Sequence, residues 1–253
     1  MMAHDVEVSM LRAARTERVA IPQLSDTFPS LDLLTAYEIQ AEQRAGFGPL
    51  VGWKLGVTSR AKQQQVGVDA PIYGFLAGDH VLDLGEPLVV AEHISPRCEP
   101  EIVFVIGRDL SGAHVTATEV LGATAGVAVG IEVLDSRYTD YRFTMPDVVA
   151  DNASAGRYVV GTPVPPHGLD LRLVGVVLEL GGEVVATASG AASLGHPAAA
   201  VAWLVRELAA SGEGLRAGEV VLSGGLTAAV PVSAGDVVVA TIDRLGSVEL
   251  ACR

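Results

Sequence analysis

Two glutamates, Glu99 and Glu101, precede a strongly β-prone apolar run at residues 102–107. Side chains alternate between the faces of a strand, so both carboxylates project to one face, about 6–7 Å apart along the backbone. Like charges on one face repel each other and resist burial unless a cation lies between them. Carboxylate oxygen is the ligand that Mg²⁺ prefers. The spacing therefore predicts a metal site or, alternatively, an edge strand with two solvated glutamates.

The composition predicts a sizeable buried core. Of the 253 residues, 49% are hydrophobic, and the mean hydropathy is +0.39. A chain of this length forms one large domain, or a core domain with a smaller N-terminal extension. Many glycines and valines and few aromatic residues favour β-structure with tight turns.

The charge excludes one class of partner and constrains another. A formal net charge of −13 leaves too few basic side chains to neutralise nucleic-acid phosphates. An anionic substrate would need local positive charge, from a metal ion or from a few well-placed basic residues.

The only cysteines are Cys98 and Cys252, which make neither a disulfide framework nor a zinc motif. The N-terminus lacks the pattern of a signal peptide, and no apolar run approaches the ~20 residues that span a bilayer. We therefore expect a cytoplasmic protein without membrane contact.

The pattern of elements changes near residue 50. We expect a helical N-terminal region at 1–50, with a helix at 1–18 and another that Ser30 caps, and a β-rich catalytic domain at 51–253. The remaining expected elements are strands at 52–57, 123–134, 219–222, 236–242 and 247–251, hairpins at 79–90 and 171–189, and helices at 59–66 and 197–210.

Strands in runs with segregated helices predict an α+β fold with a rolled or barrel-like sheet. A doubly wound nucleotide-binding fold is disfavoured, because no glycine-rich phosphate loop follows the first strand.

Three further polar positions are chemically informative, although each has an ordinary structural alternative. Glu132 ends a buried-looking run and either serves a site or marks a strand end that reaches water. Lys54 lies in an apolar strand and either does chemistry or extends to solvent. Asp151, with Asn152 after it, either faces a site or forms a turn or helix cap.

Taken in order, these positions fall in motifs that resemble one known family. The motifs are GWKLGVTS (52–59), PRCEPEI (96–102), IEVLDSRY (131–138), VADNAS (149–154) and LSGGLT (222–227). They are similar to those of the 2-keto-4-pentenoate hydratase / 2-oxohex-3-enedioate (4-oxalocrotonate) decarboxylase family of the fumarylacetoacetate hydrolase superfamily. The resemblance runs from about residue 20 to the C-terminus and implies that superfamily's rolled mixed sheet.

The decarboxylase branch looks closer. PIYGFL (71–76), DSRY (135–138) with YRF (141–143), and GGLTAAV (224–230) resemble decarboxylases, and hydratases usually differ at all three places. Two departures are small: Cys98 stands where a β-branched residue is usual, and Ser95 where decarboxylases often carry histidine.

The resemblance implies a Mg²⁺ or Mn²⁺ site formed by Glu99, Glu101 and Glu132. It places Lys54 in the substrate pocket, where it would neutralise a carboxylate or donate a proton. Further candidates for substrate binding are Arg137, Asp151 and Ser223, although the structural role of an ion-pair partner is favoured for Arg137.

Three functions follow as hypotheses. The first is metal-dependent decarboxylation of a 2-oxo-3-enedioate to a 2-hydroxy-2,4-dienoate through a stabilised dienolate. The second is a hydratase that adds water to such a dienoate, giving a 4-hydroxy-2-oxo acid. The third is a non-catalytic partner subunit. The resemblance further implies a role in aromatic compound catabolism and association with a paralogous hydratase. A chain this apolar is also expected to bury surface against copies of itself, as a homo-oligomer.

Overall fold

The structure is a computed structural model that describes residues 4–59, 63 and 70–253. Its named helices are α1 (Asp5–Glu17), α2 (Leu24–Thr27), α3 (Leu33–Gln43), α5 (Ala117–Ala123), α6 (Met145–Ala150) and α7 (Pro197–Ala210). Its strands are β1 (Leu50–Gly56), β2 (Ile72–Ala77), β3 (Val81–Leu82), β4 (Arg97–Ile106), β5 (Thr124–Leu134), β6 (Ala155–Val160), β7 (Gly175–Leu180), β8 (Glu183–Ser189), β9 (Val220–Leu222), β10 (Val230–Pro231), β11 (Val237–Ile242) and β12 (Gly246–Ala251).

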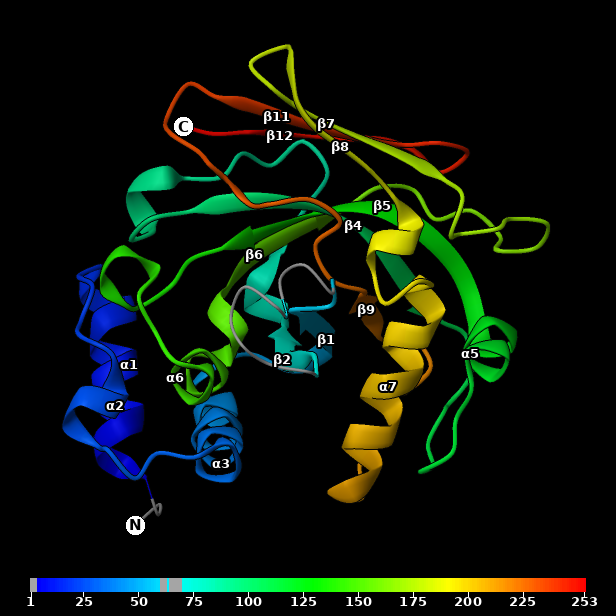
Figure 1. Cartoon of the computed structure of the whole chain (residues 1–253). Coiled ribbons are helices and arrows are strands. Elements are labelled where there is room, and N and C mark those ends of the chain that lie inside the picture. Colours follow the sequence, from blue (N-terminus) through cyan, green and yellow to red (C-terminus); the bar gives the residue numbers. More distant parts are fainter. Residues whose placement is uncertain (1–3, 60–62, 64–69) are drawn as a thin grey trace.

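The larger sheet is mixed and curled. In the described part of the chain it has eight strands. Seven of them lie in the order β2-β1-β9-β4-β5-β6-β3, and the eighth, β10, pairs with one end of β4. The pairs β1–β9 and β3–β6 are parallel, whereas β4–β5 and β5–β6 are antiparallel. Figure 1 shows the long strands β4 and β5 arching over β1, β2 and β9. The expected α+β fold with a rolled mixed sheet is confirmed.

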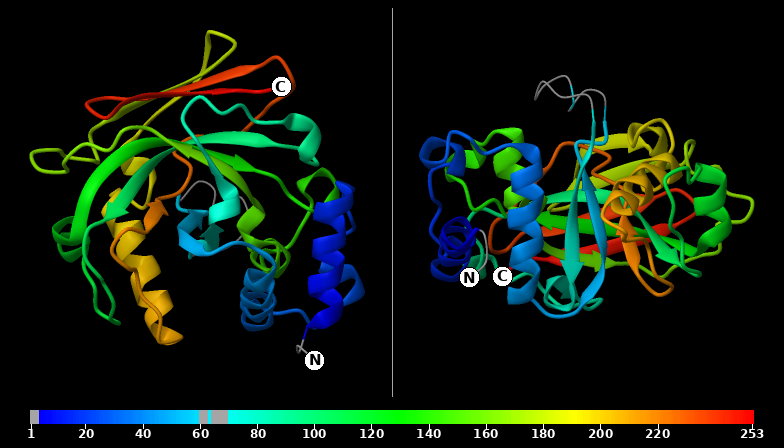
Figure 2. Two further views of the ribbon diagram at one scale, coloured as in Figure 1. Left: turned by 180° about the vertical axis from the view of Figure 1, so that it is seen from behind. Right: turned by 90° about the horizontal axis from the view of Figure 1, so that it is seen from below.

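The two faces of β4 and β5 have different environments. Ile102 and Phe104 of β4 and Val129 of β5 belong to the main core, together with Leu178 and Val238 of the second sheet. That second sheet, in the order β12-β11-β7-β8, lies across the outside of the arch (Figures 1 and 2). The outer face is therefore covered by apolar packing, so that a catalytic site can lie only on the inner face.

The strand β4 is interior and not an edge. It pairs along its length with β5, and its other side pairs with β9 at residues 103–105 and with β10 at residues 97–98. Pro100, which has no N–H to donate, lies between these two stretches, so no β9 or β10 hydrogen bond is lost there. The alternative of an edge strand with solvated glutamates is wrong, because Glu99 and Glu101 are both buried.

The N-terminal helices pack on the middle of the chain. Leu11 of α1 and Ile39 of α3 share a core cluster with Val149 of α6. Two glutamine side chains of α3 add polar contacts: Gln40 donates to the carbonyl of Val149 at 2.9 Å, and Gln43 donates to the carbonyl of Ala150. The division into two regions at residue 50 therefore remains a prediction. The two regions pack against each other through buried side chains.

Several local predictions agree with the structure. The hairpin β7–β8, the strand β5 and the helix α7 occur where expected. The helix at α3 begins later than predicted: its cap is Asp32, whose carboxylate accepts from Thr35 N at 2.9 Å, and not Ser30. The hairpin expected at 79–90 is wrong, because β3 pairs in parallel with the distant β6. The helix expected at 59–66 lies largely outside the described residues.

Both cysteines are buried free thiols. Among the described residues, no helix combines the length and the apolar character that crossing a membrane requires.

Candidate active site

Three buried carboxylates meet on the inner face of the arch. The register pairs Glu99 of β4 with Glu132 of β5, and Glu101 follows Glu99 on the same face. Their exposed fractions are 5% for Glu99, 0% for Glu101 and 2% for Glu132. Three acids this deeply buried form a costly arrangement unless positive charge compensates for it.

Glu101 shows this cost directly. Burial, and next the negative charge of Glu132, raise the pKa of Glu101 well above its usual range. Its Oε2 accepts a hydrogen bond from Gly224 N at 2.6 Å. Its Oε1 has no hydrogen-bond partner in the described part of the chain. Burial also raises the pKa of Glu132, against the opposing effect of Lys54.

Lys54 is the buried cation of the cluster. It lies on β1, opposite Leu222, the last residue of the short strand β9. Its Nζ lies 3.0 Å from Glu132 Oε1, an ion pair that is not aligned as a hydrogen bond. The same Nζ donates to the carbonyl of Ala153 at 2.9 Å. Lys54 does not extend to solvent.

The loop after β9 approaches the acids with its backbone. Gly224 has φ +99°, and its N–H donates to Glu101. At Gly225 a Cβ atom would lie 1.4 Å from Glu99 Oε2. Only glycine allows the main chain to lie this close to the Glu99 carboxylate.

The turn that supplies the Ala153 carbonyl is strained. Asn152, Ala153 and Ser154 all have positive φ, at +51°, +50° and +57°, which costs on the order of 1 kcal/mol for each residue. The Asn152 side chain accepts from Phe75 N at 2.8 Å and donates to Phe75 O at 3.0 Å, which ties the turn to β2. Such strain persists only where the surroundings impose it.

A cavity of about 540 Å³ opens beside these groups. Its wall contains Lys54, Glu99, Ser154 and Gly225, and a second basic side chain, Arg97. The rest of the lining includes the apolar residues Leu55, Val57, Ile72, Leu134, Phe143, Met145 and Val148. The cavity is therefore polar beside the acids and apolar elsewhere.

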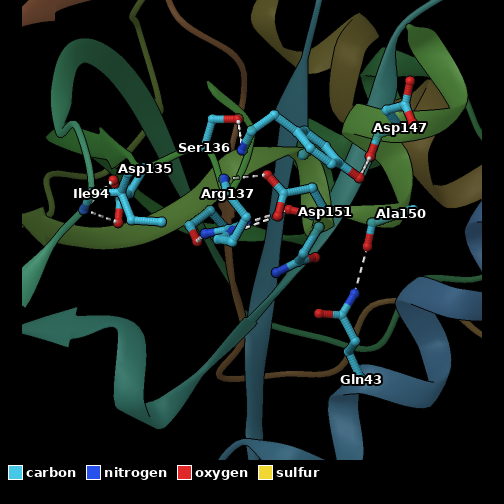
Figure 3. A network of polar contacts seen from close by, with 12 residues as sticks. Gln43, Ile94, Asp135, Ser136, Arg137, Asp147, Ala150 and Asp151 are labelled. Atoms are coloured by element: carbon cyan, nitrogen blue, oxygen red, sulfur yellow. Dashed lines mark hydrogen bonds and ion pairs between the residues drawn. The ribbon is translucent and has the colours of Figure 1, made fainter. Parts of the chain in front are cut away.

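Arg137 and Asp151 form a buried ion pair (Figure 3). The Arg137 backbone N–H donates to Asp151 Oδ2 at 3.1 Å, its Nε contacts Oδ1, and its Nη1 donates to Ala155 O at 3.0 Å. Burial alone would lower the pKa of Arg137, but the Asp151 carboxylate reverses the effect and holds it above its usual value. Neither side chain lines the 540 Å³ cavity.

Ser223 is buried next to the acids. Its hydroxyl donates to the carbonyl of Ile102 at 2.8 Å, and its own carbonyl accepts from the Ser193 hydroxyl at 2.6 Å. It is absent from the residues that line the cavity. The proposed substrate contacts of Arg137, Asp151 and Ser223 therefore remain predictions, and the three residues support the turn and the loop that do border the cavity.

Three residues that border the cavity were not predicted as site residues from the sequence: Arg97, Ser154 and Gly225. The spacing carried a signal for Arg97, because it precedes Glu99 by two residues and so shares its face of β4. Ser154 and Gly225 gave no such signal, because a backbone conformation and a close approach are tertiary properties.

The donor set is chemically suited to a hard divalent cation, since it consists of carboxylate oxygens. As they stand, however, no three acidic, histidine or cysteine side chains among residues 4–59, 63 and 70–253 are arranged to hold a metal ion. Glu132 is engaged with Lys54.

Comparison with known proteins identifies the family. Residues 50–251 match the family model described as fumarylacetoacetate (FAA) hydrolase C-terminal. The chain is 44% identical to the 2-keto-4-pentenoate hydratase of Paraburkholderia xenovorans strain LB400 over 245 residues, which cover 95% of this chain and 91% of that protein. It is 42% identical to the 4-oxalocrotonate decarboxylase of Pseudomonas sp. strain CF600 over 233 residues, covering 90% and 88%.

A solved structure is similar over the whole length. The 4-oxalocrotonate decarboxylase from Pseudomonas putida G7, complexed with magnesium and adipate, gives a TM-score of 0.93 at 36% identity and covers 100% of this chain and 99% of that one. The fold is thus that of a fumarylacetoacetate hydrolase superfamily enzyme. Within that superfamily, the chain belongs to the family of 2-keto-4-pentenoate hydratases and 4-oxalocrotonate decarboxylases, which are lyases.

Proposed function

We propose that this enzyme decarboxylates a 2-oxo-3-enedioate of the 4-oxalocrotonate type to a 2-hydroxy-2,4-dienoate, with Mg²⁺ or Mn²⁺ held by Glu99, Glu101 and Glu132. The observation that carries the proposal is the buried cluster of these acids with Lys54 beside a cavity that has an otherwise largely apolar lining. The similarity to a decarboxylase solved with magnesium and a six-carbon diacid supports it.

The residues fit the proposed cation in two respects. Glu101 Oε1 is buried and has no hydrogen-bond partner in the described residues, and the negative charges of Glu132 and Glu99 raise the cost of ionising Glu101. A cation would relieve both. Glu132 contacts Lys54 through Oε1, so its other carboxylate oxygen is the one that could bind the cation with that contact kept. When bound, the ion supplies a Lewis acid for the negative charge that develops on the 2-oxo oxygen.

The chain's own residues perform the remaining steps. Breaking the bond to the distal carboxylate releases CO₂, and its electron pair delocalises through the C3–C4 double bond onto the 2-oxo oxygen. Lys54 Nζ carries three N–H bonds, of which the Ala153 carbonyl accepts one. We assign Lys54 the donation of a proton to the dienolate. The apolar wall excludes water from the distal end of the substrate and suits the uncharged product CO₂.

Hydration is the second candidate, and the 44% identity to a hydratase favours it. The two activities separate when each substrate is supplied alone. We expect the enedioate to release CO₂ stoichiometrically and the 2-hydroxy-2,4-dienoate to lose its ultraviolet absorbance no faster than in buffer. Rapid loss of the dienoate without CO₂ from the enedioate would replace the decarboxylase with the hydratase.

Cation binding is expected to weaken as the pH falls. The carboxylates must be ionised to bind a metal, and Glu101 holds its proton to a higher pH than an ordinary glutamate because of burial and Glu132. Below the raised pKa, each displaced proton lowers the apparent affinity about tenfold per pH unit. Calorimetric Mn²⁺ titrations between pH 8 and 5.5, in buffers that differ in ionisation enthalpy, measure both the affinity and the protons released. Exhaustive chelation should abolish turnover, and an affinity independent of pH would contradict the assignment.

Substituting Gly225 with alanine is expected to weaken Mn²⁺ binding and turnover about ten- to a hundredfold. The new Cβ would lie 1.4 Å from Glu99 Oε2, so the carboxylate must move. Gly175→Ala on β7 is the matched control, because nothing lies within 4 Å of its Cβ position. Equal Mn²⁺ affinity in the two variants would remove Glu99 from the proposed ligand set.

A further inference from the structure

Arg97 has the properties of a substrate anchor. It is half-buried at the first position of β4, and its side chain lines the 540 Å³ cavity together with Lys54 and Glu99. Its Nε is buried and has no hydrogen-bond partner in the described part of the chain. A buried donor without an acceptor is costly, so an acceptor from outside the chain would be stabilising here.

The guanidinium lies over an aromatic ring. Its Cζ is 3.9 Å from the centroid of the Tyr141 ring, a cation–π contact that suits arginine. The Tyr141 hydroxyl is in turn within hydrogen-bond distance of the carbonyls of Ser95, at 2.9 Å, and Leu134, at 3.1 Å. The guanidinium is therefore positioned before any ligand binds, which reduces the conformational entropy that is lost on binding.

Among the described residues that line the cavity, Arg97 is also a cation that no carboxylate pairs with. The charge of Lys54 is balanced by Glu132 at 3.0 Å. Within the described residues, no carboxylate forms an ion pair with Arg97. A protein with a net charge of −13 needs such local positive charge to admit a dianion.

We infer, on the basis of the proposed function, that Arg97 binds the carboxylate next to the 2-oxo group of the substrate, and not the carboxylate that leaves. Two arguments select this end. Arg97 and Glu99 lie on one face of β4, about 6–7 Å apart, and the 2-oxo end of the substrate is the end that meets the acids. A guanidinium paired with the departing carboxylate would stabilise its charge in the ground state and oppose its loss as neutral CO₂.

The test compares two saturated, unreactive 2-oxo acids in the presence of Mn²⁺: 2-oxopentanoate, with one carboxylate, and 2-oxoadipate, with two. Calorimetry gives the affinity of each acid and of Mn²⁺ alone for the wild type and for Arg97→Gln. We expect both acids to bind about ten- to a hundredfold more weakly to the variant, by the same factor, since one charged hydrogen-bonded contact is lost from each. The Mn²⁺ affinity should not change.

Two further variants serve as controls. Arg97→Lys keeps the charge but loses the planar fork, so both acids should bind it with intermediate affinity, and this variant decides the matter if Arg97→Gln fails to fold. Arg172→Gln removes an exposed arginine paired with Asp170 and should bind both acids like the wild type.

Other outcomes overturn the inference in distinguishable ways. A loss confined to 2-oxoadipate places Arg97 at the departing carboxylate, and unchanged affinity for both acids removes it from substrate binding; either result leaves the proposed function standing. Failure of the wild type to bind either acid overturns the proposed function and the inference together.

Discussion

Replacing Glu101 with glutamine is expected to abolish most turnover while making the protein without metal more stable. Glutamine keeps the shape and can still accept from Gly224 N, but it removes a carboxylate that the proposed cation needs. Loss of several kcal/mol of charge stabilisation corresponds to about a thousandfold in rate. The Mn²⁺ affinity should fall in parallel.

The expected gain in stability of the Glu101→Gln variant follows from the raised pKa of Glu101. Because burial and Glu132 raise the pKa of Glu101 in the folded protein, its contribution to stability is present at low pH and is lost as the pH rises through the raised value. At pH 8 the neutral glutamine avoids this loss, and each kcal/mol gained raises the melting temperature by about 2–4 °C.

Glu249→Gln is the matched control, because Glu249 is exposed on β12; it should change neither melting nor turnover. A Glu101→Gln enzyme that turns over like the wild type would exclude Glu101 from the chemistry. If the metal-free Glu101→Gln variant has a lower melting temperature than the wild type, the Glu101 carboxylate stabilises the fold.

Replacing Asp151 with asparagine is expected to lower the free energy of unfolding by about 3–5 kcal/mol, because Arg137 is left buried without its counter-ion. The Arg137–Asp151 pair closes the loop between β5 and the strained turn 152–154 (Figure 3). Urea unfolding followed by fluorescence and by circular dichroism measures the change. The turn that carries the Ala153 carbonyl should loosen, so turnover should also fall.

A double variant, Arg137→Met with Asp151→Leu, separates structure from substrate binding. If the pair is structural, removing both charges recovers most of the stability. If Asp151→Asn instead unfolds like the wild type but binds 2-oxoadipate poorly, the pair contacts the substrate, as the resemblance had suggested.

The parts of the fold that were predictable are those with a local cause. The hairpin β7–β8, the strand β5 and the helix α7 each carry their turn, apolar or cap signal within a few residues. The hairpin expected at 79–90 failed because the partner of β3 is β6, more than 70 residues away, and sequence patterns do not encode such a partner. The three-residue strand β9, which joins β1 to β4, was expected as a strand, but its central position was not.

The site residues show the same difference between local and long-range causes. Alternation along one strand was enough to place Glu99 and Glu101 on one face. The sequence pattern also drew attention to Glu132 and Lys54, and the resemblance gave these two residues their roles. The contact between Lys54 and Glu132 joins strands β1 and β5, which are far apart in the sequence, and the role of Gly225 depends on a loop lying against β4. The strain at residues 152–154 arises because Asn152 is tied to β2.

The two glutamines of α3 have a practical consequence. Gln40 and Gln43 hold the last carbonyls of α6, and the very next residues form the turn that orients Lys54 through Ala153. The family model begins at residue 50 and so omits this brace. An enzyme trimmed to its matched segment would keep Glu99, Glu101 and Glu132 but lose both glutamine contacts, which lie next to the turn that carries the Ala153 carbonyl; the leading helices should therefore be retained when the protein is shortened.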